Sequence, residues 1–146
     1  MLKYEYGDKA ENNSYGEAKM IKYSINQGYF KAVTGREIPY SDSIKLAAAK
    51  NGGDSATVTL LSDNNEGGIK LSVGECPAGV TCSAFLVHTL MANGEKWPDP
   101  LTELDGEIDL TANEYQSIYI RFDWCNFQHS FISASIGNCY RNIIIS

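Results

Sequence analysis

Hydrophobic and polar residues alternate with a period of two along most of the chain. The clearest case is the segment 117–124, where Ile118, Ile120, Phe122 and Trp124 fall on one face and polar residues on the other. Successive side chains of a strand point to opposite faces, so the pattern predicts a half-buried strand with Trp124 in the core. The same criterion predicts strands at residues 2–6, 21–25, 56–60 and 69–73, and two closing strands at 131–136 and 140–145.

Turn residues separate these segments. Gly- and Asn-rich stretches at 51–53, 63–68, 93–94 and 137–138 predict hairpins, because their residues tolerate a positive φ. Residues 85–91 are apolar on both faces, which predicts a central strand covered on each side. Residues 44–51, with three alanines, form the one segment that could be a short helix. The prediction is one all-β domain over residues 1–146: an antiparallel, Greek-key β-sandwich of about eight strands, immunoglobulin-like or jelly-roll.

One short segment resembles a known family. Tyr115 stands just before the strand at 117, and Leu110 lies five residues upstream. This arrangement resembles the tyrosine corner of immunoglobulin-like sandwiches. The resemblance covers six residues and implies that the Tyr115 phenol bonds back to the backbone that precedes it.

Composition and charge exclude some classes of protein. The chain of 146 residues is 43% hydrophobic and 21% charged, which is typical of a folded domain. Its net charge is −6, its lysines are dispersed along the chain, and it has only three arginines. No phosphate-binding surface and no nucleic-acid partner are therefore expected. No apolar run approaches the roughly 18 residues needed to cross a bilayer, so no membrane insertion is expected.

Four cysteines suggest an oxidising compartment. The spacings of Cys76, Cys82, Cys125 and Cys139 do not match the tight ligand pairs of structural zinc sites. Turn residues between Cys76 and Cys82 favour a local disulfide, and a second disulfide is predicted between Cys125 and Cys139. Other pairings, or four buried free thiols, remain open alternatives. Two disulfides would indicate an extracellular or cell-surface location.

Acidic residues recur at every second position in one segment. If that segment is extended, Glu103, Asp105, Glu107 and Asp109 share a face, and bound calcium would relieve their repulsion. A solvated acidic edge needs no metal, so calcium is an alternative and no other cofactor is expected.

Candidate chemistry is mainly aromatic. Trp97 stands in a predicted loop stiffened by two prolines, and Tyr119 lies on the polar face of the segment 117–124, so both are predicted to bind a ligand. His88, within an apolar run, is expected to be a core residue. Cys125 and His129 could form a thiol–base pair, but no third group that would orient the base is evident, and no catalytic residues are predicted.

These observations favour an extracellular recognition or adhesion module, not an enzyme, which binds a glycan or a protein on a surface. A first alternative is a structural subunit of a surface fibre or pilus, assembled through an unpaired terminal strand at residues 140–146. A second alternative is a small secreted hydrolase.

Overall fold

The computed structural model of the chain describes residues 3–5, 21–49, 51–73, 76, 78–125, 131–139 and 142–145; for 3–5, 72–73, 131–139 and 142–145 it describes the backbone alone. Within these ranges every regular element is a strand, which confirms the all-β prediction. The eleven strands are β1 (Lys3–Glu5), β2 (Ile21–Gln27), β3 (Ser43–Ala47), β4 (Gly53–Ser62), β5 (Glu66–Val73), β6 (Val80–Ala92), β7 (Glu95–Glu103), β8 (Glu107–Leu110), β9 (Tyr115–Trp124), β10 (Phe131–Cys139) and β11 (Asn142–Ile145).

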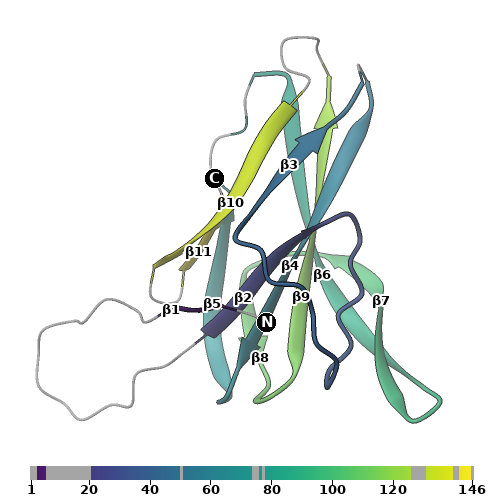
Figure 1. The fold of residues 1–146 in the computed structure, drawn as a ribbon, viewed down its shortest axis with the longest axis vertical. Coiled ribbons are helices and arrows are strands. Elements are labelled where there is room, and N and C mark those ends of the chain that lie inside the picture. Colours follow the sequence, from purple (N-terminus) through teal and green to yellow (C-terminus); the bar gives the residue numbers. More distant parts are fainter. Residues whose placement is uncertain are drawn as a thin grey trace, which may run out of the picture.

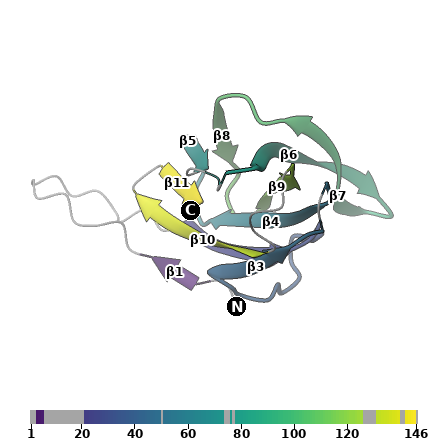
Figure 2. The same ribbon diagram turned by 90° about the horizontal axis from the view of Figure 1, so that it is seen from above.

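The strands form two sheets (Figures 1 and 2). One has six strands in the order β1-β2-β4-β9-β6-β7, and the other has five in the order β3-β10-β11-β5-β8. Neighbouring strands in the described part of the chain are antiparallel, except that β11 runs parallel to β5. The parallel pair was not predicted.

Most connections carry the chain from one sheet to the other. The predicted hairpin at Asn93-Gly94 is correct: both residues have positive φ and they join β6 to β7 in one sheet. The turns predicted at 51–53 and 63–68 instead join strands of different sheets, and residues 137–138 lie inside β10. Turn residues mark where the chain reverses, but they carry no information about which sheet receives the next strand.

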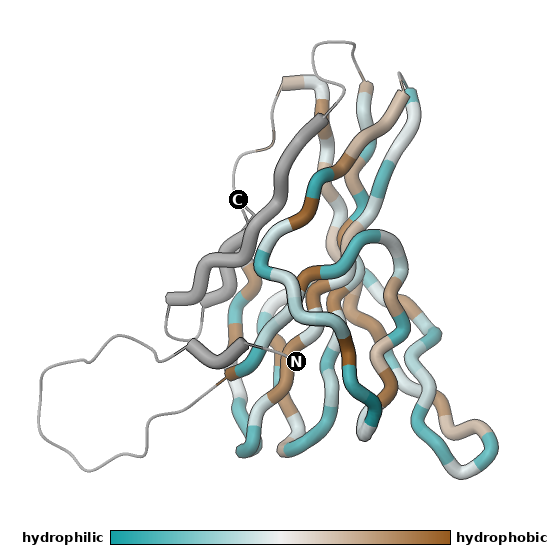
Figure 3. The backbone as a smooth tube through the Cα atoms, viewed as in Figure 1, coloured by the Kyte–Doolittle hydropathy of each residue, from teal (hydrophilic) through white to brown (hydrophobic). Residues whose placement is uncertain are grey.

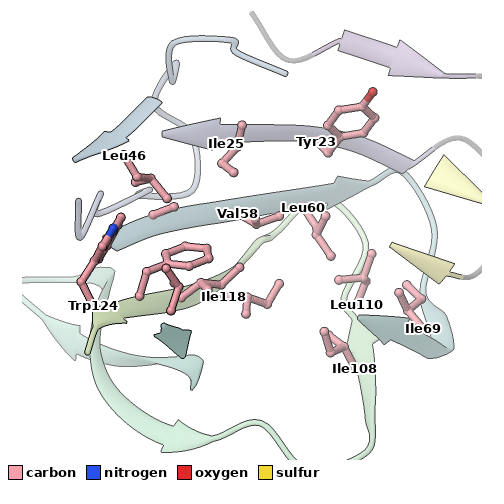
Figure 4. Close-up of a cluster of buried hydrophobic side chains, with 14 residues drawn as sticks. Tyr23, Ile25, Leu46, Val58, Leu60, Ile69, Ile108, Leu110, Ile118 and Trp124 are labelled. Carbon is pink, nitrogen blue, oxygen red and sulfur yellow. The ribbon is translucent and has the colours of Figure 1, made fainter. Parts of the chain in front are cut away.

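The inward side chains of the two sheets meet in one hydrophobic cluster (Figure 4). Its buried members are Tyr23, Ile25, Leu46, Ala56, Val58, Leu60, Ile69, Val80, Ile108, Leu110, Ile118, Ile120, Phe122 and Trp124. Trp124 is 2% exposed, which confirms its predicted place in the core. Figure 3 shows hydrophobic and hydrophilic residues alternating along the coloured strands. This alternation is what a strand with one buried face requires.

Half of the segment predicted as a short helix, residues 44–47, lies in a strand. Residues 43–47 form β3, which pairs antiparallel with β10. Leu46 on this strand is fully buried in the core. Burial of this side chain and the ladder of hydrogen bonds outweigh the weak helix propensity of the three alanines.

The β6–β7 hairpin extends beyond the rest of the six-stranded sheet (Figure 1). β6 pairs with β9 only as far as Leu86, and beyond that residue it pairs with the edge strand β7 alone. Leu90 and Met91 are therefore 48% and 67% exposed. The prediction that residues 85–91 are covered on both faces is wrong for this outer part.

The last strand is internal to its sheet. β11 pairs antiparallel with β10 on one side and parallel with β5 on the other. The prediction of an unpaired terminal strand at residues 140–146 is therefore wrong for residues 142–145. The other residues of that range lie outside the described part of the chain.

The segment 28–41, between β2 and β3, crosses the outer face of the six-stranded sheet, the face opposite the main core. The backbone N–H of Phe30 donates to Thr57 Oγ1 at 2.9 Å, and Thr57 Oγ1 donates to the carbonyl of Gly28 at 2.7 Å. Ala32 and Ile38 are buried in a second, smaller hydrophobic cluster with Phe30, Leu61 and Tyr115. This segment therefore gives the sheet a partial second layer.

Candidate ligand-binding face

Four aromatic residues from distant parts of the sequence lie on or against the outer face of the six-stranded sheet. Tyr119 alternates with the inward Ile118 and Ile120 on β9, and its register partner on β6 is Phe85. Because paired residues of an antiparallel ladder point to the same side, both rings lie on the outer face. Segment 28–41 adds Tyr29, and β7 adds Trp97. We call Tyr29, Phe85, Trp97 and Tyr119 the outer aromatic group.

The Tyr119 ring contacts the rings of both Tyr29 and Phe85. The ring centroids of Tyr29 and Tyr119 are 5.3 Å apart with the planes at 68°, an edge-to-face arrangement. Phe85 lies 6.1 Å from Tyr119 with the planes at 38°. The three rings are partly exposed. Aromatic pairs at these separations attract each other beyond the effect of area burial, so the rings hold one another in place.

Charged groups border the Tyr29 ring. The ammonium of Lys31 lies 5.7 Å from the centroid of the Tyr29 ring and 3.4 Å from a carboxylate oxygen of Asp99. The phenol of Tyr29 donates a hydrogen bond of 2.9 Å to the backbone carbonyl of Asp99. Burial, the Asp99 carboxylate and Tyr119 together raise the pKa of Tyr29. The Tyr29 hydroxyl is therefore neutral at physiological pH.

Trp97 lies in a strand, not in the predicted loop. It belongs to β7, where its register partner is Leu90. The Arg36 guanidinium lies 5.0 Å from the centre of the Trp97 ring and also forms an ion pair of 2.9 Å with Glu95. Arg36 therefore covers part of the indole, and this part is not an open platform.

Tyr115 attaches segment 28–41 to β9. Its phenol donates a hydrogen bond of 2.7 Å to the carbonyl of Arg36, and its backbone N–H donates to Thr34 Oγ1 at 3.1 Å. Burial raises the pKa of Tyr115, the Glu37 carboxylate raises it further, and Lys22 partly opposes the shift. The hydroxyl reaches a residue 79 positions upstream, so the bond expected from the tyrosine-corner resemblance, to the backbone just before Tyr115, is wrong.

The structure brings Trp97 and Tyr119, the two predicted ligand-binding residues, to one side of the same sheet. It adds Tyr29, Phe85 and Lys31, which sequence reasoning did not select. Tyr29 and Lys31 have no alternating pattern around them, and their place beside Tyr119 depends on the path of segment 28–41. The strand register could have identified Phe85 if the pairing of β6 with β9 had been known.

The four acidic residues do not share one strand face. Glu103 ends β7 in the six-stranded sheet, whereas Glu107 and Asp109 lie on β8 in the five-stranded sheet. The chain turns between them at Asp105 and at Gly106, whose φ is +84°. The prediction of one extended acidic face is therefore wrong.

Two of these carboxylates contact groups of the five-stranded sheet. Glu107 lies 3.9 Å from the Lys70 ammonium, and Asp109 accepts a hydrogen bond of 3.3 Å from the backbone N–H of Gly68. Within the described ranges no three His, Cys, Asp or Glu side chains are grouped to hold a metal ion. The structure thus assigns these two carboxylates to contacts within the sheet.

The predicted disulfides are not formed among the cysteines whose side chains the structure describes. Cys76, Cys82 and Cys125 are free thiols. Burial, followed by the effect of Cys76, raises the pKa of the Cys82 thiol to about 12. The predicted partner of Cys125 is Cys139, whose side chain lies outside the described part of the chain.

His88 is not part of the outer aromatic group. His88 is exposed, and its Nε2 shares a hydrogen bond of 2.7 Å with Thr102 Oγ1. Its predicted core position is wrong because β6 no longer pairs with β9 beyond Leu86 and extends past the main core. His129, considered as a base beside Cys125, lies outside the described residues.

Comparisons with protein-family models, with curated proteins and with solved structures find no match to this chain. In the residues that the structure describes, no helix is long and apolar enough to span a membrane.

Proposed function

We propose that this chain is an extracellular recognition or adhesion module, not an enzyme, and that it binds a surface glycan at the outer aromatic group. The observation that supports the proposal is the meeting of Tyr29, Phe85 and Tyr119, from three separate parts of the chain, in one partly exposed cluster. The main core lies on the other face of the sheet, so packing of the core does not explain why these rings are exposed there. Exposed apolar groups of this kind often mark a binding site.

The chemistry of the cluster suits a sugar. Aromatic faces pack against the apolar C–H faces of a sugar ring, and neighbouring polar groups fix its orientation. Lys31 supplies a donor beside the rings, and the Asp99 carboxylate, whose side chain is 59% exposed, supplies an acceptor. A ligand that carries many hydroxyls can use both groups.

Trp97 has a flanking role in this proposal. Arg36 lies over its ring, and Trp97 pairs with Leu90, further along β6 than the Phe85 that pairs with Tyr119, so Trp97 stands apart from the three-ring cluster. Tyr119, which contacts both other rings of the cluster, would supply the main stacking surface.

The test is a glycan array probed with the purified full-length chain, followed by calorimetric titration of the best ligand. We expect Tyr119→Ala to weaken binding at least about tenfold, or about 1.4 kcal/mol, and Trp97→Ala to weaken it less. Lys45→Ala, on β3 of the five-stranded sheet, is the matched control and should leave affinity unchanged.

Two results would contradict the proposal. The first is a Tyr119→Ala protein that folds normally and keeps full affinity for the array ligand. The second is the absence of any glycan ligand, with specific binding to a purified surface protein instead, which would make the chain a protein-recognition module.

The fibre-subunit alternative receives less support. Its proposed edge, β11, already pairs on both sides. The edge strand β7 of the six-stranded sheet carries Pro98 and Pro100, which have no N–H to donate to an added strand. A concentration series in size-exclusion chromatography tests this alternative, because strand exchange would produce oligomers.

A further inference from the structure

The outer face of the six-stranded sheet continues along β9 beyond the outer aromatic group. The outward side chains that follow Tyr119 on this strand are Arg121 and Asp123, because the residues between them point into the core. Two positions along a strand span about 6.8 Å, so Arg121 is the next outward residue after the central ring of the aromatic cluster. Its side chain is 59% exposed. A cationic group therefore stands beside the proposed stacking surface.

The neighbours of Arg121 across the sheet are small. Its register partners are Ser55 on β4 and Ser83 on β6, and paired residues of adjacent strands point to the same side of a sheet. Neither short side chain can cover a guanidinium group, and Ser83 is itself exposed. A ligand can therefore reach Arg121 from the solvent.

One carboxylate holds Arg121 but leaves part of its guanidinium free. Nε and Nη2 of Arg121 lie 3.0 Å and 2.9 Å from the same oxygen of Asp123, Oδ1. A guanidinium has five N–H donors, and no other residue in the described part of the chain bonds to this one. Both N–H groups of Nη1 and the second N–H of Nη2 therefore remain for a ligand.

Asp123 does not separate Arg121 from the aromatic cluster. It lies beyond Arg121 along β9 as counted from Tyr119, and its register partner on β4 is Gly53. A side chain at Gly53 would place its Cβ 2.9 Å from Asp123 Oδ1, so the carboxylate occupies the space that such a side chain would fill. The position of Asp123 therefore leaves the path between Tyr119 and Arg121 open.

We propose that Arg121 forms a second subsite of the glycan site and binds a carboxylate, so that the ligand is an acidic glycan with a sialic or uronic acid. The inference rests on the proposed glycan binding and adds the class of sugar. One N–H from each of Nη1 and Nη2 can donate two parallel bonds to the two oxygens of a carboxylate. Lys31 lacks this planar fork, and Arg36 stands with Trp97 apart from the three-ring cluster.

The existing charges oppose such a ligand only weakly. The net charge of the chain is −6, but charges more than about 8 Å apart are largely screened at physiological salt. The ion pair of Arg121 with Asp123 is exposed, at 59% and 35% of the two side chains, and exposed pairs contribute little to stability. Arg121 can therefore share its charge with a ligand at little cost to the fold.

The experiment uses the full-length chain and two acidic probes, sialyllactose and an oligogalacturonate, each compared with its methyl ester. The ester keeps the sugar rings and removes the negative charge. Calorimetric titration should show that at least one acid binds at least about tenfold more tightly than its ester. Equal binding of acids and esters, or binding of neither acid, would overturn the inference.

A glycan array separates this failure from failure of the proposed function. The array carries sialylated, uronate-containing, sulfated and neutral glycans, and the strongest ligands should carry a carboxylate. Preference for neutral glycans, or for sulfated glycans without a carboxylate, would overturn the inference and leave glycan recognition in place. An array without any ligand would contradict the proposed function itself, and the inference with it.

Variants assign the effect to Arg121. Arg121→Gln should weaken binding of the acidic probe at least about tenfold and leave binding of the ester unchanged, and Arg121→Lys, which keeps the charge without the fork, should lose less. Lys70→Gln on β5 is the matched control, because it removes one positive charge from the other sheet. Equal losses in Arg121→Gln and Lys70→Gln would reduce the effect to net charge and overturn the inference.

A substitution at Asp123 should act in the opposite direction. Asp123→Asn keeps an oxygen that can accept from Arg121 but removes a negative charge beside the bound carboxylate. We expect the acidic probe to bind at least about twofold more tightly and the ester to bind as before. An unchanged or weaker affinity for the acid would show that its carboxylate does not lie beside Arg121, and would overturn the inference.

Discussion

The two faces of the six-stranded sheet are built in different ways. The inner face buries aliphatic and aromatic side chains against the five-stranded sheet (Figure 4). The outer face of the same strands buries hydroxyl groups, and Thr57, Thr59 and Ser117 are 0%, 0% and 3% exposed beneath or beside segment 28–41. Apolar contacts on the inner face tolerate small shifts, whereas the outer face depends on specific hydrogen bonds, since a buried polar group without a partner is costly.

The largest contrast is expected between the two tryptophans. Trp124→Ala empties a fully packed position of the inner face and should lower the free energy of unfolding by about 3 to 5 kcal/mol. Trp97→Ala on the outer side removes the contact with Arg36 and should cost about 1 kcal/mol or less. Urea unfolding of both variants measures the difference. Equal losses would show that the outer side is packed as tightly as the core.

A further variant refines the interpretation of Trp124. Its indole N–H has no hydrogen-bond partner among the described residues. Trp124→Phe keeps an aromatic ring and removes this donor, so we expect a loss of only about 1 to 2 kcal/mol. A loss as large as that of the alanine variant would indicate that the N–H does bind a partner.

The buried hydroxyl pair tests the outer face directly. Thr59 Oγ1 and Ser117 Oγ are 3.2 Å apart and fully or nearly fully buried. Thr59→Val should cost about 1 to 2 kcal/mol, because the Ser117 hydroxyl loses this partner. The double variant Thr59→Val/Ser117→Ala should cost less than the sum of the two single variants, as measured in a thermodynamic cycle. Strict additivity would mean that the two hydroxyls do not interact.

Removal of one oxygen atom, the Tyr115 hydroxyl, should weaken the attachment of segment 28–41 to β9. Tyr115→Phe removes the hydrogen bond to the Arg36 carbonyl and should lower stability by about 1 kcal/mol. Hydrogen exchange gives a local readout: the Arg36 N–H, which donates to the Val33 carbonyl at 3.0 Å, should exchange faster in the variant. Unchanged exchange at Arg36, with exchange in β9 accelerated, would place the effect in the sheet and not in the segment.

The smallest expected effect is a loss of stability at alkaline pH. The pKa values of Tyr29 and Tyr115 are raised in the folded chain above the ordinary tyrosine value of 10.0. The unfolded chain therefore releases these protons first, so their contribution to stability is present below about pH 10 and is lost as the pH rises through the folded pKa values. Urea unfolding from about pH 8 to about pH 11 should show a smaller decline for Tyr29→Phe/Tyr115→Phe than for the wild type.

The sequence by itself determined the strands and the inner face. Period-two alternation is a local property, so Ile118, Ile120, Phe122 and Trp124 could be assigned to one buried face without knowledge of the fold. The same alternation placed Tyr119 on the opposite face. Local pattern failed where pairing decided the outcome, as at residues 44–47: the alanines at 47–49 favoured a helix, but these residues pair with β10 as strand β3.

Tertiary structure alone decided what lies on the outer face. Tyr29 reaches Asp99 across 70 residues, and Tyr115 reaches Arg36 across 79. The position of Arg36 over Trp97 likewise has no counterpart in the sequence pattern. Contacts of large sequence separation depend on which sheet each connection enters and on the path of segment 28–41, and neither produces a periodic signal in the chain.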